Sequence, residues 1–115
     1  MTRAAHSWGQ AQAAERPGLI RLGYFGSYAR GNWGVGSDLD LVAVLDSSDR
    51  PFGERPLDWD LTPLPVPADL LVYTREEWNT VVHRGDRFAH TMTTEVVWLF
   101  SRTTPDQAVT DSSQA

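Results

Sequence analysis

The sequence predicts an α+β domain in which short apolar strands alternate with helices. Apolar, β-prone runs recur along the chain, and each is bounded by glycine or by residues that start or stop helices. The chain has 115 residues, of which 41% are hydrophobic, as expected for one globular domain with a single core. We therefore expect one domain over residues 1–102. Residues 103–115 are polar and lack periodicity, which predicts a flexible C-terminal tail.

The first half of the chain is expected to run helix, strand, turn, strand. Residues 2–16 mix Ala, Gln and Glu and end at a Pro-Gly pair, which predicts a helix followed by a breaker. Residues 19–25 are apolar and lie between two glycines, as a strand would. Ser27 stands where a helix N-cap belongs, ahead of a helical turn over residues 28–30. Residues 39–45 are apolar on both faces, which predicts a central strand.

A long connection and a third strand follow. Residues 46–68 contain five prolines, and structureless loops of this length are uncommon in compact domains and are often functional. We expect at most a short helical piece near residues 57–61. Residues 70–73 predict the third strand, with Asp69 at its mouth.

The last part of the domain is expected to be helix, helix, strand. Thr74 is followed three residues later by Glu77, a capping-box pattern that predicts a helix as far as about residue 83. A second helical piece over residues 86–91 leads to a last strand over residues 95–100.

Composition excludes several classes of protein. The net charge is −5 and all ten basic residues are arginine, so a nonspecific nucleic-acid binder is not expected, and neither is a phosphate loop that depends on Lys. The chain has no Cys, which removes disulfides and thiolate metal sites from consideration. No apolar run approaches the roughly 20 residues that span a bilayer, and the N-terminus has no signal-like apolar region. We expect a soluble, cytoplasmic protein without a membrane partner.

Two aspartates stand at the entrance of the predicted central strand. Asp38 and Asp40 are two residues apart, so on a strand both side chains point to one face. Two like charges in that position repel each other unless a cation lies between them, and hard divalent ions are the usual partner of paired carboxylates. Mg²⁺ prefers one or two protein carboxylates together with substrate phosphates, which makes this pair a suitable half-site for a nucleoside triphosphate.

A second half-site precedes the first. Gly26 and Ser27 stand at a strand-to-helix turn, where free N–H groups attract phosphate and glycine allows close approach of the backbone. Arg30 can add a bidentate contact to phosphate. Each piece alone has an ordinary structural explanation, as a turn with a cap or as solvated aspartates. Their conjunction, in the order strand, turn, helix, loop, strand, favours the functional interpretation.

Other sites with two aspartates fit less well. Aspartyl-phosphate phosphatases and many glycosyltransferases place the pair after an apolar strand, whereas here the pair precedes it. A calcium loop is excluded because leucines and valines fill the positions where further oxygen ligands should stand. His83 and His90 lack a carboxylate at ligand spacing and are interpreted as surface or helix-end residues. Trp33 lies between the two half-sites, and contact with a base, a partner or the core stays open.

With these residues in place, the pattern GSYARG…SDLDL resembles the signature of the DNA polymerase beta nucleotidyltransferase superfamily, specifically its minimal nucleotidyltransferases. The similarity covers roughly residues 20–74. The resemblance implies a mixed β-sheet flanked by helices, like the polymerase beta palm. It also implies transfer of a nucleoside monophosphate from a nucleoside triphosphate to a hydroxyl, with two divalent ions. By resemblance, Gly26 and Ser27 hold phosphate, Asp38 and Asp40 are metal carboxylates, and Asp69 is the third.

The family also suggests partners. Many minimal nucleotidyltransferases are antitoxins that modify or bind a helical ribonuclease toxin, so we expect ATP, Mg²⁺ (with Mn²⁺ as a substitute) and a small helical partner or a homodimer. Arg30 matches a frequent arginine of the family whose role is less clearly catalytic. Two alternatives stay open: a catalytically idle module that only neutralises a toxin, and an enzyme of aminoglycoside type that modifies a small molecule. The Pro-rich connection departs from relatives that have a clear helix there.

Overall fold

A computed structural model of the protein describes residues 2–32, 34 and 36–102. Its centre is a four-stranded sheet in the order β3-β2-β1-β4. The strands are β1 (Leu19–Phe25), β2 (Leu39–Leu45), β3 (Ala68–Thr74) and β4 (Val97–Ser101). β2 and β3 are parallel, and β1 runs antiparallel to both β2 and β4. The mixed sheet with flanking helices that we expected is therefore confirmed.

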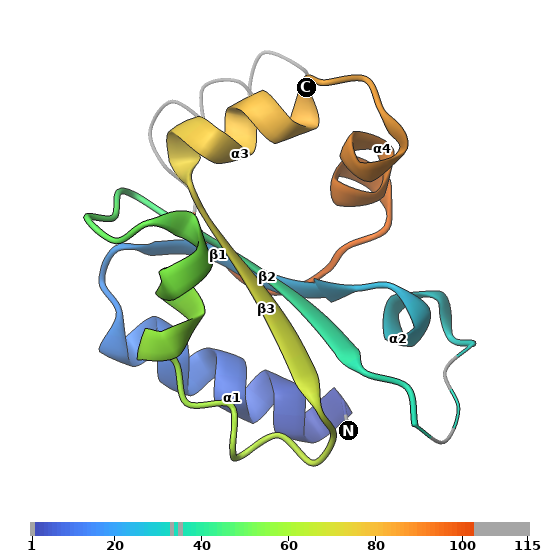
Figure 1. Ribbon diagram of the computed structural model, residues 1–115. Helices are drawn as coiled ribbons and strands as arrows, with labels where there is room; N and C mark the ends of the chain where they lie inside the picture. Colours follow the sequence, from blue (N-terminus) through green and yellow to red (C-terminus); the bar gives the residue numbers. More distant parts are fainter. Residues whose placement is uncertain (1, 33, 35, 103–115) are drawn as a thin grey trace.

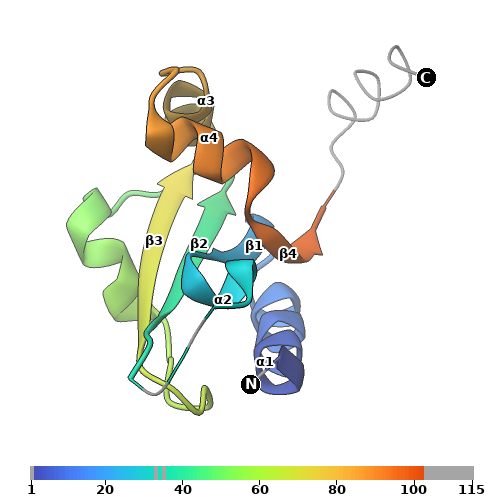
Figure 2. The ribbon, with the colours of Figure 1, turned by 90° about the vertical axis from the view of Figure 1, so that its right-hand side faces the viewer.

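Helices cover both faces of the sheet. α1 (Thr2–Glu15) lies against one face, and α3 (Arg75–Val82) with α4 (Arg87–Thr94) lies on the other, as Figures 1 and 2 show. The short α2 (Ser27–Arg30) follows β1 at the end of the sheet. No helix in the described ranges is long and apolar enough to cross a membrane. The expected tail over residues 103–115, and Trp33, lie outside the described residues, so the domain boundary stays a prediction.

The strands alternate between two apolar cores. The larger core lies on the α1 side and includes Trp8, Leu22 and Leu41, while the smaller one lies on the α3–α4 side and includes Val42, Trp78 and Met92. The alternation of side chains along β2 explains the split, since its odd-numbered residues enter the first core and Val42 and Val44 enter the second. Asp40 therefore shares the face of the sheet that α3 and α4 cover.

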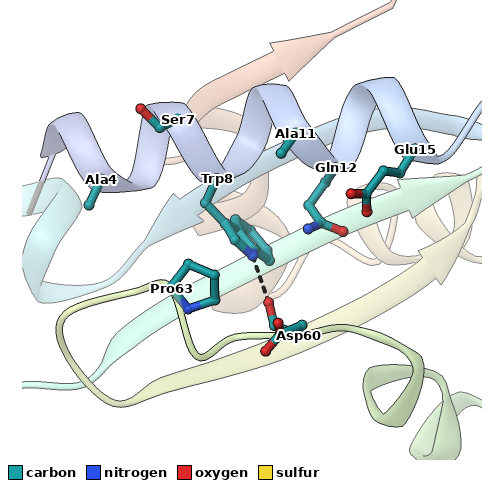
Figure 3. A pocket seen from close by; sticks show the side chains of 8 residues that line it. All are labelled: Ala4, Ser7, Trp8, Ala11, Gln12, Glu15, Asp60 and Pro63. Carbon is teal, nitrogen blue, oxygen red and sulfur yellow. Dashed lines mark hydrogen bonds between the residues drawn. The ribbon is translucent and has the colours of Figure 1, made fainter.

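Several hydrogen bonds tie the Pro-rich connection to the rest of the domain, among them one made by Arg55 and one accepted by Asp60. It contains a 3₁₀ helix, η1 (Phe52–Asp58), which lies earlier than the helical piece expected near residues 57–61. The difference arises because Arg55, within η1, is buried and donates from Nη1 to the Val72 carbonyl at 3.0 Å. Beyond η1, Trp8 Nε1 donates to the Asp60 carbonyl at 2.8 Å, across the pocket between α1 and the connection that Figure 3 shows.

Several local expectations were wrong in detail, including the last strand, which begins at Val97 rather than at residue 95 because α4 continues to Thr94. Gly26, not Ser27, is the N-cap of α2, and no side-chain hydrogen bond caps this helix, because Ser27 is already its first helical residue. β3 begins at Ala68, earlier than expected, so Asp69 lies inside the strand. Parallel pairing with β2 accounts for the extension, since it gives the backbone groups of these residues partners that sequence propensity does not show.

Candidate functional site

The site is built around two neighbouring carboxylates. In the parallel β2–β3 ladder, Asp40 is paired in register with Asp69, so the two side chains emerge next to each other at the start of both strands. Asp40 is partly buried and Asp69 is exposed. Asp38 precedes β2, is also exposed, and lies near enough to influence the charge on Asp40. The structure thus brings together the carboxylates that the sequence separates by about thirty positions.

The C-terminal end of β1 lies beside Asp40. Phe25 is the antiparallel partner of Asp40, so Gly26 follows directly beside the carboxylate. Gly26 has φ 76°, a conformation that residues with a side chain rarely adopt. A Cβ atom at Gly26 would collide with Asp40 Oδ2. Glycine is therefore required here both for the turn and for the close approach of Asp40.

Cationic and hydroxyl groups stand opposite the carboxylates. Ser27 and Arg30 come from α2, and Arg87 and Thr91 come from α4; all four line a cavity of about 550 Å³ that also contains Asp40. Arg30 Nη1 lies 3.7 Å from Glu95 Oε1, in the turn after α4. A second cavity, also about 550 Å³, lies on the other side of Asp40 and is lined by Asp69 with apolar residues of β3 and the connection. Asp40 stands between a polar cavity and a more apolar one.

The charge on Asp40 is poorly compensated. Its pKa is raised, first by burial, then by the negative charges of Asp69 and Asp38, and Arg30 offsets this only in part. A carboxyl group held among like charges favours either a proton or a bound cation. Asp40 therefore lacks the charge compensation of a satisfied ion pair, as a carboxylate that takes up a proton or a cation would.

The donor set fits a hard divalent ion that brings further ligands with it. Within the described part of the chain, no group of three or more His, Cys, Asp or Glu side chains lies close enough to hold a metal ion by itself. The adjacent Asp40 and Asp69 offer carboxylate oxygens, which Mg²⁺ accepts while drawing its remaining ligands from water and substrate phosphates. This is an open half-site rather than a closed cage.

Sequence reasoning missed the contribution of α4. Arg87 and Thr91 are four residues apart and so face the same side of the helix, but nothing in the sequence connects this face with the turn after β1. Glu95 was missed for the same reason. The histidines take no part: His83 contacts the Asn79 carbonyl through Nδ1 at 2.6 Å, and neither it nor His90 lines these cavities.

Comparisons with known proteins agree with this arrangement. The family model of the nucleotidyltransferase domain matches residues 11–91. No curated protein matches the chain significantly in sequence.

Solved structures show the same fold. A Sulfolobus solfataricus protein described as a nucleotidyltransferase superimposes with a TM-score of 0.62 and 21% identity, covering 89% of this chain and 81% of its own. A toxin–antitoxin complex with AMP-PNP gives a TM-score of 0.60 and 18% identity, over 93% of this chain and 77% of that one. A doubly substituted variant of the toxin–antitoxin pair MntA–HpeT, with two aspartates changed to glutamate, gives 0.57 and 17%, over 87% and 74%.

At 17 to 21% identity these structures support the fold alone. The family match extends over most of the chain, from α1 into α4, and includes Asp38, Asp40 and Asp69 as well as the turn that holds Gly26. It also bears out the resemblance seen in the sequence. The chain therefore belongs to the nucleotidyltransferase domain family, and the protein is a nucleotidyltransferase.

Proposed function

We propose that this nucleotidyltransferase moves AMP from ATP to a hydroxyl group of a partner protein, with Mg²⁺, and that it acts in the cytoplasm as the antitoxin of a toxin–antitoxin pair. The observation that carries the proposal is the in-register pairing of Asp40 with Asp69 beside the Gly26 turn. It places two carboxylates next to the cavity between α2 and α4, which we call the groove. The guanidinium and hydroxyl groups that line this groove can donate hydrogen bonds to phosphate.

The chemistry follows from this placement. An acceptor hydroxyl oxygen attacks the α-phosphorus of ATP, a new P–O bond forms, the bond to the bridging oxygen of the β-phosphate breaks, and pyrophosphate leaves. Asp69, exposed and facing the more apolar cavity, is positioned to take the proton of the attacking hydroxyl. Bound Mg²⁺ would be held by Asp40 and Asp69, with Asp38 at the edge of the site, and would neutralise charge on the phosphates.

The groove between α2 and α4 is suited to the triphosphate of the nucleotide. Ser27 and Arg30 face Asp40 across the groove, so phosphates that share a metal with Asp40 lie within reach of both residues. Asp40 is partly buried, and charges that are less screened by water attract a shared cation more strongly. The residues of α2 hold the triphosphate, and the carboxylates act on its α-phosphate.

The partner is proposed from the relatives of the fold. Two of the similar structures are toxin–antitoxin assemblies, and one of them contains AMP-PNP, an ATP analogue. Both cavities beside Asp40 are open, so an acceptor held by a second protein can approach Asp69 from outside. A small helical protein is the expected partner, and a second copy of this chain is the alternative.

The test uses the full-length protein with labelled ATP, Mg²⁺ and the candidate partner. We expect label on the partner only when all components are present. Asp69→Asn should retain much of the nucleotide affinity, since Asp40 remains as a metal ligand, but should lower transfer by about a hundredfold or more because it removes the proton acceptor. Asp38→Asn/Asp40→Asn should also lose Mg²⁺-dependent ATP binding, measured by calorimetry.

Three outcomes would contradict the proposal in different ways. Undiminished Mg²⁺-dependent binding by the double variant would remove these carboxylates from the nucleotide site. Transfer to a free aminoglycoside without any second protein would identify a small-molecule enzyme. A partner that binds tightly but is never labelled would identify a binding module without transfer.

A further inference from the structure

α4 forms the second wall of the groove beside Asp40. The T-shaped contact between Phe25 and Phe88, with ring centroids 6.2 Å apart, anchors the helix against the end of β1. Met92 is buried in the core on the same side of the sheet. With these two side chains fixed, Arg87 and Thr91 line the cavity opposite α2. The position of Arg87 at the groove is therefore a consequence of packing.

The two arginines of the groove are in different states. Arg30 is engaged by Glu95, whose Oε1 is buried, has no hydrogen bond from the described residues, and lies 3.7 Å from Arg30 Nη1. Arg87 is exposed, and the structure shows no ion pair or hydrogen bond of its side chain with any residue it describes. Its guanidinium is thus an uncommitted cation facing Asp40 across the groove.

Helix formation does not explain this arginine. Arg87 is the first residue of α4, at the positive end of the helix dipole, where a basic side chain is unfavourable. Other arginines near the site have structural partners, such as Arg84 with Asp86 at 3.1 Å. What distinguishes Arg87 from other exposed arginines is its place in the wall of the cavity that contains Asp40, where an unpaired guanidinium is free to bind an anion from outside the protein.

We propose that Arg87 binds the β- and γ-phosphates of the nucleotide, so that α4 and α2 clamp the triphosphate from opposite sides. The inference rests on the proposed function, because it takes the α-phosphate to be at Asp40 and Asp69. A chain of phosphates leading from Asp40 into the groove meets Ser27 and Arg30 on one wall and Arg87 on the other. A guanidinium can bind such phosphates through two parallel hydrogen bonds.

The clamp also assigns the two cavities. The groove between α2 and α4 holds the leaving pyrophosphate, whereas the cavity with Asp69 and the apolar side chains of β3 and the connection is left for the acceptor. Donor and acceptor then approach Asp40 from opposite sides, as attack opposite the leaving group requires. Arg87 would discriminate triphosphate from monophosphate without touching the base.

The experiment compares affinities for a non-hydrolysable ATP analogue and for AMP, in Mg²⁺, by calorimetry. Arg87→Gln should weaken binding of the analogue about tenfold or more, because it removes charge-assisted hydrogen bonds. Its affinity for AMP should change by less than about twofold, since AMP lacks the phosphates concerned. Arg87→Lys should recover part of the loss, because it restores the charge but not the fork. Arg3→Gln, an exposed position on α1 at the opposite face of the sheet, is the control with the same charge change and should bind like the wild type.

The outcomes separate this inference from the proposed function. If the wild type binds the analogue and Arg87→Gln binds it equally well, or loses affinity for AMP to the same extent, the phosphate clamp is wrong while the nucleotide site stands. If the wild type binds neither nucleotide, the proposed function fails and the clamp fails with it. Thermal melting of each variant confirms that an exposed substitution has left the fold intact.

Discussion

Glu77 and Asp40 are two carboxylates whose pKa values the structure shifts in opposite directions. Glu77 accepts hydrogen bonds from Arg55 at 2.5 and 3.1 Å and from the Thr74 backbone at 2.9 Å, and its pKa is lowered, chiefly by the bond from Arg55. Asp40 accepts no pKa-lowering hydrogen bond from the residues that the structure describes; burial and its acidic neighbours raise its pKa instead. The fold compensates the negative charge of Glu77, whereas the negative charge of Asp40 is left largely uncompensated.

The difference separates structure from function within one chain. The Arg55–Glu77 pair joins η1 to the start of α3 and so holds the Pro-rich connection in place. The Asp40–Asp69 pair holds nothing together, because its members repel each other. A pair that opposes folding yet occupies the partly buried end of two strands is typical of a site that gives up stability for binding.

The largest expected effect on stability is at the Arg55–Glu77 pair. Arg55→Met removes the donor to Glu77 and to the Val72 and Arg50 carbonyls, and leaves these acceptors unpaired. We expect a loss of about 2 to 4 kcal/mol, toward the lower value because Glu77 is partly exposed to water. In contrast, Asp40→Asn measured without divalent ions should leave the free energy of unfolding unchanged or raise it by up to about 1 kcal/mol.

Urea unfolding of both variants at neutral pH measures these changes. Glu77→Gln is the comparison variant. It leaves the Val72 and Arg50 carbonyls bonded to Arg55, so it should lower the free energy of unfolding less than Arg55→Met does. A clear loss of stability in Asp40→Asn would show that this carboxylate is structural after all.

A second prediction compares the two glycines that flank α2. Gly26 and Gly31 have nearly the same φ, 76° and 78°, but a Cβ at Gly31 meets open space whereas one at Gly26 meets the Asp40 carboxylate. Gly31→Ala, at φ 78° and ψ 12°, should lose about 1 kcal/mol from strain in the left-handed region. Gly26→Ala should lose about 2 to 3 kcal/mol, because its φ of 76° with ψ of −150° is a conformation that only glycine commonly adopts, and because the Cβ would meet Asp40. Mg²⁺-dependent nucleotide binding should fall about tenfold or more only in Gly26→Ala, because displaced Asp40 oxygens no longer match the ion.

Calorimetry and thermal melting on the two variants provide the comparison. Equal nucleotide affinity in Gly26→Ala and Gly31→Ala would mean that the approach of Asp40 to the turn is not needed for binding.

Local signals made much of the fold predictable. The strands over residues 19–25 and 39–45 were predicted with their observed bounds, because each is an unbroken apolar run with clear limits. The capping box of Thr74 and Glu77 was also predicted and is present. The candidate residues near Asp40 could be named because their spacing along one strand and one turn is a local property.

What could not be predicted depends on tertiary contacts. The register that sets Asp69 beside Asp40 arises from strand pairing across the long connection and is encoded by no local pattern, so only the family resemblance pointed to Asp69 as the third carboxylate. The α4 wall with Arg87 requires the packing of Phe88 on Phe25, which are far apart in sequence. Glu77 shows both cases, since its role as a cap is local whereas its partner Arg55 lies 22 residues away.

The smallest expected effect concerns the pH dependence of stability. The folded-state pKa of Glu77 lies below its ordinary value of 4.5, so its ionised form stabilises the fold above that pH. This contribution should disappear as the pH falls from about 4.5 through the lowered folded-state pKa, when the carboxyl group takes up a proton. Glu77→Gln removes the titrating group, and its stability should therefore fall less steeply than that of the wild type over the same acidic range. Because Glu77 is partly exposed, the difference should stay below about 1 kcal/mol, which calls for parallel urea titrations at closely spaced pH values.

Asp86→Asn is the matched control, since Asp86 caps α4 through the Ala89 N–H at 2.8 Å but lies outside the Arg55 contact. Parallel acid profiles for the wild type and Glu77→Gln would show that the bond from Arg55 does not distinguish Glu77 from an ordinary surface carboxylate, and the contrast with Asp40 would then rest on Asp40 alone.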